Sequence, residues 1–86
     1  MYTVSWRTEM LDRLADLYVA ADPAERERMA TAVEALNRRL ATAPEAEGES
    51  RGADVRLAFI DLLAVRFRVD LMADRVRVVG VRRYGR

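Results

Sequence analysis

Residues 64–84 read AVRFRVDLMADRVRVVGVRRY, and the expected fold follows from this stretch. From residue 64 to residue 69 apolar side chains alternate with arginine, and valine alternates with arginine again from residue 75. Alternation with a period of two is typical of a strand that buries one of its faces. Residues 70–74 lie between the two runs as a turn, so the stretch predicts two successive strands of one sheet.

The alternation also sorts the side chains by face, because neighbouring residues of a strand point to opposite sides of a sheet. Val65, Phe67 and Val69 point to one side, as do the first valines of the second run. If these apolar side chains pack against helices, the intervening arginines share the opposite face. The alternation then breaks, and it places Val79 and Val81 on the arginine face as a small apolar patch.

An earlier run, VRLAF at residues 55–59, predicts a third strand. In this run Leu57 and Phe59 oppose Arg56, so we expect the two apolar residues on the core side. The expected arginine face then comprises Arg56, Arg66, Arg68, Arg75 and Arg77. Like charges on one sheet face repel one another unless solvent or an anion meets them.

The start of the chain predicts one strand followed by a helix. Apolar and polar residues alternate over residues 2–6 (YTVSW), as in a short strand. Apolar residues then recur at helical spacing over residues 10–21, with Thr8 as the expected N-cap. The sole tryptophan, Trp6, is expected to anchor the core under the helices.

A second helix is expected to follow directly. Asp22-Pro23-Ala24-Glu25 combines an N-cap residue, a proline in the first helical turn and a glutamate that completes a capping box. Four apolar residues then form one stripe: Met29, Val33, Leu36 and Leu40. Ala43-Pro44 ends the helix, and residues 44–52 (PEAEGESRG) are expected to form a polar, acidic loop.

The predicted order is therefore β-α-α-β-β-β. It corresponds to an α+β fold with a helical hairpin packed on one face of an antiparallel sheet. A chain of 86 residues has room for one domain, so residues 1–86 are treated as a single unit.

Composition excludes several kinds of chemistry. The chain has no cysteine, which rules out disulfides and thiolate metal sites, and no histidine, the commonest acid/base group at neutral pH. We expect no metal and no cofactor, and we interpret the acidic residues Glu45, Glu47 and Glu49 as a solvated loop. No apolar run approaches the length of a membrane span, and no signal peptide is recognisable, so we expect a cytoplasmic protein without membrane contact.

Charge is distributed unevenly along the chain. Residues 1–50 contain six arginines and ten acidic residues, whereas residues 51–86 contain nine arginines and four aspartates. Every basic residue is arginine, whose guanidinium group binds phosphate or carboxylate in a bidentate manner. The basic second half favours a polyanionic or acidic partner.

The whole chain resembles the RelE/ParE family of type II toxin–antitoxin toxins. The residues that carry the resemblance are the strand Y-x-V-x-W at residues 2–6, the helical hairpin, the loop P-x-x-x-G-x-x-R at residues 44–51, and the closing pair AVRFRV and DRVRVVGVRRYGR. The resemblance implies a toxin neutralised by a cognate antitoxin, associated with plasmid stabilization. It also implies one of two targets: mRNA cleaved on the ribosome, or DNA gyrase.

The resemblance implies several site residues, but two positions of this sequence depart from the family pattern. The catalytic candidates are Arg56, Arg66, Arg83 and Tyr84. The binding candidates are Arg51, Arg68, Arg75, Arg77, Arg82 and Arg86. An arginine that many RNA-cleaving members carry is replaced by Ala64, and Gly85 stands where one branch has histidine after an Arg-Tyr pair.

Enzymatic activity is therefore left open. RNA cleavage needs a general base and a general acid, and arginine supplies neither because its pKa is above about 12. Tyr84 or Glu49 would have to transfer the proton if the chain were a ribosome-dependent endonuclease. The alternative is a non-catalytic or detoxified binding module on the same fold. A homodimer and a toxin–antitoxin hetero-oligomer are the assemblies considered.

Overall fold

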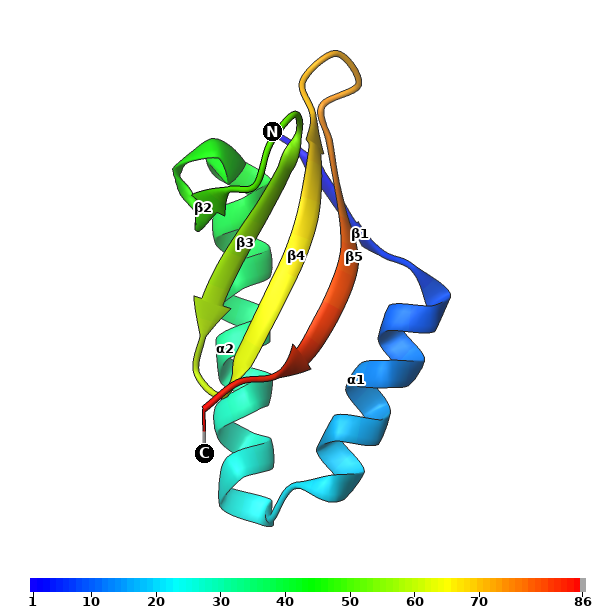
Figure 1. The fold of residues 1–86 in the computed structure, drawn as a ribbon, viewed down its shortest axis with the longest axis vertical. Helices are drawn as coiled ribbons and strands as arrows, with labels where there is room; N and C mark the ends of the chain where they lie inside the picture. Colours follow the sequence, from blue (N-terminus) through cyan, green and yellow to red (C-terminus); the bar gives the residue numbers. More distant parts are fainter. Residues whose placement is uncertain (86) are drawn as a thin grey trace.

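The computed structural model describes residues 1–85, and Figure 1 shows their arrangement. The elements in chain order are β1 (Thr3–Trp6), α1 (Thr8–Ala20), α2 (Pro23–Thr42), the 3-10 turn η1 (Pro44–Ala46), β2 (Glu49–Ser50), β3 (Val55–Ile60), β4 (Leu63–Asp70) and β5 (Arg75–Arg83). The predicted α+β fold is confirmed. One short strand, β2, lies inside the segment that was predicted to be a loop.

The strands form one sheet in the order β1-β5-β4-β3-β2. Neighbouring strands are antiparallel except β1, which runs parallel to β5 and pairs Thr3 with Arg75 and Trp6 with Val78. The predicted antiparallel sheet is confirmed for three of the four strand pairs, and the parallel pair is an addition that the sequence did not indicate. The first and last strands are therefore neighbours.

Strand β2 exists because a glycine precedes it. Gly48 has a φ of +67°, and a Cβ built there would lie 2.4 Å from the carbonyl oxygen of Leu57. No other residue permits so close an approach of the two backbones. Pairing of Glu49 with Leu57 and of Ser50 with Arg56 follows directly after this turn.

Helix α2 covers one face of the sheet and lies behind it in Figure 1. It begins with the predicted capping box, in which the Asp22 side chain accepts from the Glu25 amide at 2.8 Å. The predicted apolar stripe is buried: it comprises Met29, Val33, Leu36 and Leu40. Trp6 packs against this core, and its indole Nε1 donates to Asn37 Oδ1 of α2 at 3.0 Å.

Helix α1 lies beside β5 in Figure 1. Its N-cap is Arg7 rather than the predicted Thr8, and no side chain caps it. Pairing of β5 with β1 ends at Val78. Helix α1 packs against the rest of that edge of β5. Arg13 of α1 donates from Nε to the carbonyl oxygen of Val81 at 2.6 Å, which satisfies an edge acceptor.

A β-bulge in β5 changes the faces of its last residues. Phe67 pairs with Val78 and Arg66 pairs with Gly80, so Val79 is an extra residue without a partner. Because of this extra residue, Gly80 and Arg82 lie on the arginine face and Val81 lies on the helix side. Val81 is consequently in the core at 4% exposure. The prediction that Val81 belongs to an apolar patch on the arginine face is therefore wrong.

The predicted faces of β3 are also wrong. Leu57 pairs with Arg66 and Phe59 pairs with Ala64, so both apolar residues lie on the arginine face. Arg56 pairs with Phe67 and points to the helix side. The register is set by the two-residue connection after β3, in which Leu62 has a φ of 67°. Because β3 carries apolar residues on both faces, its pattern alone does not define the buried side.

The bulge generates a prediction. Val81→Asp should destabilise the protein by about 3 kcal/mol or more, because it buries an unpaired carboxylate in the core. Val79→Asp changes the same residue type two positions earlier, at a half-buried bulge position, and should lower the unfolding free energy by at most about 1 kcal/mol. Urea unfolding of both variants measures the difference. Equal losses would mean that Val79 and Val81 share one face.

Candidate functional site

The face of the sheet turned away from α2 is named the open face. Its residues on β3, β4 and β5 are Val55, Leu57, Phe59, Ala64, Arg66, Arg68, Asp70, Arg75, Arg77, Gly80 and Arg82, with Asp70 directly opposite Arg75. All five of its arginines are exposed. Four of the five arginines expected on one face are therefore together, and Arg82 joins them because the bulge restores the alternation.

Two arginines of the open face stand directly opposite each other. Arg68 of β4 pairs with Arg77 of β5 in the antiparallel ladder. Like charges at directly opposed positions destabilise a sheet, by roughly the 0.2–1 kcal/mol that other cross-strand pairs contribute. Arg68 is partly compensated by Asp54, whose Oδ1 lies 2.9 Å from its guanidinium, but Arg77 has no ion pair within residues 1–85.

Four arginines line one hollow of about 520 Å³ on this side of the molecule: Arg7, Arg51, Arg66 and Arg68. Arg51 thus lies beside the sheet arginines as expected. Its contact with Glu49 is 3.3 Å long and half exposed, so it neutralises little of the charge. Arg7 was not predicted, and only its position immediately before a helix distinguishes it in the sequence.

The position of Arg7 adds to the positive potential of the hollow. It is the N-cap of α1, where the helix dipole is positive, and its side chain makes no capping bond. A negatively charged group is favoured at that helix end, and Glu9 lies in the first turn, whereas the N-cap position itself carries a guanidinium group. The hollow therefore combines four guanidinium groups with a helix N-terminus, an arrangement suited to an anion.

Arg56, predicted to be catalytic, is engaged in holding the loop. Its Nε donates to the carbonyl oxygen of Glu47 at 2.8 Å, and its Nη2 donates to that of Gly48 at 3.1 Å. Both carbonyl groups precede β2. Arg56 therefore fixes the segment that leads into β2, on the helix side of the sheet.

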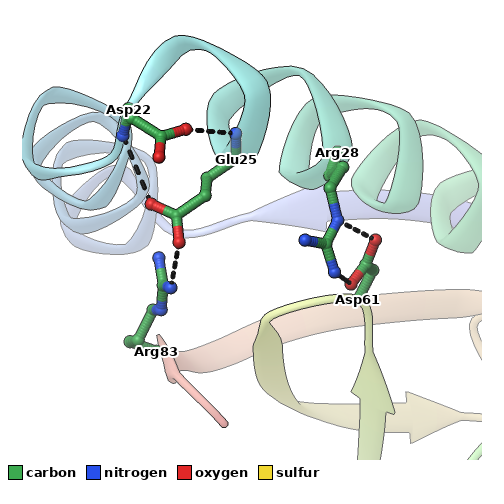
Figure 2. Close-up of polar contacts among 5 residues, drawn as sticks. All are labelled: Asp22, Glu25, Arg28, Asp61 and Arg83. Atoms are coloured by element: carbon green, nitrogen blue, oxygen red, sulfur yellow. Dashed lines mark hydrogen bonds and ion pairs between the residues drawn. The ribbon is translucent and has the colours of Figure 1, made fainter. Parts of the chain in front are cut away.

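Arg83, also predicted to be catalytic, points to the helix side as well. Its Nη2 lies 2.6 Å from Glu25 Oε2, and Figure 2 shows that the same carboxylate accepts from the Asp22 amide. These contacts, first with Arg83 and then with the Asp22 backbone, hold the pKa of Glu25 below its usual range. Arg83 therefore ties the end of β5 to the start of α2.

A second ion pair, also drawn in Figure 2, was not predicted. Arg28 of α2 makes two contacts with Asp61, at 2.9 and 2.5 Å. The hydrogen bond from Arg28 lowers the pKa of Asp61. Nothing in a linear sequence identifies this pair, because the partners lie on separate elements.

Tyr84 lies at the end of the open face. Its ring centroid is 4.6 Å from that of Phe59 at an interplanar angle of 47°, and both rings are about half exposed. Of the four predicted catalytic residues, Arg66 and Tyr84 are thus on one side of the sheet and Arg56 and Arg83 on the other. Catalytic and binding roles remain predictions for all of them. Arg86 lies outside the described residues.

Neither a metal-binding cluster nor a membrane-spanning helix occurs in residues 1–85. Within residues 1–85, no group of three carboxylate, imidazole or thiol side chains is close enough together to hold a metal ion. In the same part of the chain, neither helix has the length and apolar character required to cross a bilayer.

Comparison with known proteins supports the fold. No family model matches the sequence, and no curated protein matches it. A solved structure described as the chromosomal ParDE TA system from P. aeruginosa contains a similar chain, with a TM-score of 0.70 and 18% sequence identity. The alignment covers 99% of this chain and 98% of that one. The predicted RelE/ParE-like fold is confirmed by this likeness, which at such identity concerns the fold alone.

The Glu25 contacts generate a prediction about pH. A carboxyl group whose pKa is lowered in the folded state stabilises it above the unfolded pKa, and this contribution is lost as the pH falls. Glu25→Gln should therefore melt below the wild type at pH 7. The gap should narrow as the pH falls below the ordinary glutamate pKa of about 4.3.

Thermal unfolding monitored by circular dichroism between pH 7 and pH 3 measures this gap. Glu27→Gln is the matched control, because Glu27 lies on the same helix and makes no hydrogen bond or ion pair with residues 1–85. It should melt like the wild type at neutral pH. A Glu25→Gln gap that stays constant over the whole range would contradict the proposed role of the Glu25 charge.

Proposed function

We propose that this chain is the toxin of a type II toxin–antitoxin system, and that it inhibits growth by gripping an anionic target through the open face. The fold supports the first part, since a similar chain occurs in the ParDE TA system of P. aeruginosa. The exposed arginines support the second part. The proposal implies a cytoplasmic protein with a cognate antitoxin as its partner.

The observation that carries this proposal is the direct opposition of Arg68 and Arg77. A sheet built only for stability would place opposite charges or β-branched residues at such positions. On the helix side the chain does pair its arginines, as Arg28 and Arg83 show. On the open face four of the five arginines, all except Arg68, make no ion pair within residues 1–85. Such an excess of positive charge suits a surface for an anionic partner.

Binding is favoured over cleavage. The chain has no histidine and no lysine, and Arg56 and Arg83 are both occupied by contacts within the chain. Of the four catalytic candidates, Arg66 is left on the open face as a charge stabiliser and Tyr84 as a proton donor, and Tyr84 packs on Phe59. We therefore favour inhibition of DNA gyrase, which requires binding, over cleavage of mRNA on the ribosome.

A non-toxic binding module is the second candidate, and the same observation favours it. The divided catalytic set and the engaged Arg83 suit a protein that has kept the arginine face and lost the inhibitory activity. The two candidates differ in one outcome, the effect of the chain on growth.

Growth provides the first test. Inducing the chain alone in bacteria should arrest growth, and co-expressing the neighbouring small open reading frame should relieve the arrest. The double variant Arg66→Gln/Arg77→Gln should abolish the arrest, because it removes two charges from the open face. Arg38→Gln should keep it, because Arg38 is an exposed residue of α2 that pairs only with Glu34.

The double variant should remain folded. Removing Arg77 relieves the like-charge contact with Arg68, so its unfolding free energy should equal or exceed that of the wild type by up to about 1 kcal/mol. A folded double variant that still arrests growth would refute the role of the open face. Normal growth with abundant soluble wild-type protein would leave only the non-toxic binding module.

Tyr84→Phe separates binding from cleavage. The variant keeps the ring against Phe59 and removes only the hydroxyl group, so growth arrest should persist within about threefold of the wild-type dose. Purified wild-type protein should inhibit DNA supercoiling by gyrase and leave mRNA intact on translating ribosomes. Loss of arrest in Tyr84→Phe, together with site-specific mRNA cuts, would instead establish a nuclease.

A further inference from the structure

A second hollow on the open face has a different character. It measures about 270 Å³ and is named the anchor pocket. Its floor consists of apolar or small residues of the sheet, Leu57, Ala64 and Gly80, and its rim carries three arginines, Arg13, Arg66 and Arg82. Its lining is more apolar than that of the hollow described above, in which four arginines join Val55 and Val79.

Two small residues create this pocket. Gly80 opposes Arg66, and Ala64 opposes Arg82, so the small residues occupy diagonal positions on adjacent strands. Each small residue leaves the space beside a long arginine unfilled. A Cβ built on Gly80 would lie 3.3 Å from Arg66 Cβ, so a side chain at this position would crowd Arg66. Because Gly80 lines the pocket, such a side chain would also reduce its volume.

Helix α1 supplies the remaining wall. Met10 and Arg13 line the pocket where α1 runs along the edge of β5. Arg13 is held there by the 2.6 Å hydrogen bond from its Nε to the carbonyl oxygen of Val81. This bond uses only Nε, so its two Nη groups remain free to bind an anion at the rim. The side chains of Arg66 and Arg82, residues of β4 and β5, make no hydrogen bond or ion pair within residues 1–85.

The volume indicates the kind of occupant. Small-molecule sites usually enclose about 300–1,000 Å³ and bury most of their ligand. The anchor pocket is slightly below this range, which suits one or two side chains of a larger partner. Its aliphatic floor contains no ring on which a base would stack, since Phe59 and Tyr84 do not line it.

We infer that the anchor pocket binds an acidic segment of a protein partner, with an aliphatic side chain seated on the floor and flanking carboxylates bound by the rim arginines. The inference rests on the proposed function and names the chemistry of a partner of the same face. Burial of the aliphatic side chain supplies the apolar contribution, and bidentate guanidinium–carboxylate contacts fix the orientation of the segment.

The test uses the full chain, labelled with ¹⁵N, in an NMR titration. The probe is the blocked peptide Ac-Asp-Glu-Leu-Glu-Asp-NH2. The largest shifts should occur at the amides of Ala64, Gly80 and Arg82. Replacing leucine by serine in the peptide should weaken binding about tenfold or more, because the apolar contribution is lost.

Variants of the protein locate the site. Gly80→Val fills the pocket and should abolish binding of the leucine peptide. Arg82→Gln removes an exposed rim charge, cannot affect the core, and should weaken binding about fivefold or more. Arg38→Gln, which removes a distant charge of the same kind, should bind like the wild type.

Three outcomes would overturn the inference. The leucine and serine peptides would bind equally, or the shifts would avoid Ala64 and Gly80, or a short oligothymidylate would move these same amides more strongly than the peptide. Failure here is distinguishable from failure of the proposed function. If the chain arrests growth but does not bind the peptide, only the proposed role of the anchor pocket is refuted. If it binds the peptide but does not arrest growth, only the proposed toxin function is refuted.

Discussion

Phe67 opposes Val78, Arg66 opposes Gly80, and Val79 between them has no partner. This irregular pairing of β4 with β5 determines both sides of the sheet. Before the bulge it places Val76 and Val78 in the core, and after it Val81 takes their role. Without the extra residue, Val81 would face solvent and Arg82 would face the helices. One inserted residue therefore keeps the core valines on one side of β5, and Arg75, Arg77 and Arg82 on the other, over its whole length.

The sequence predicted the elements better than their faces. Periodicity identified both helices, the capping box at Asp22 and every strand except β2, because these features depend on neighbours in the chain. The orientation of β3 was missed, since Leu57 and Ile60 make both of its faces partly apolar and only the register with β4 selects one. Contacts such as Arg28 with Asp61 depend on the assembled fold and leave no local signal.

Arginine has different roles on the two faces of the sheet. On the helix side, Arg56 donates to backbone carbonyl groups, and Arg83 shares a carboxylate with the helix cap. These arginines act as structural ties between elements. On the open face, within residues 1–85, Arg68 alone makes an ion pair, with Asp54, and Asp70 lies opposite Arg75 in the ladder, while the other guanidinium groups face solvent. Counting arginines in the sequence cannot separate these roles, whereas the positions of the acidic residues in the fold can.

The parallel pairing of β1 with β5 joins residues 3–6 to residues 75–78. Bringing together segments so far apart in sequence requires closure of a loop that contains both helices and most of the sheet. Such non-local contacts raise the relative contact order and slow folding. The strand that organises both faces is also the last to be synthesised among those described. Nascent chains therefore lack a completed core until β5 has been synthesised, so the arginine face is assembled only after the helices have emerged.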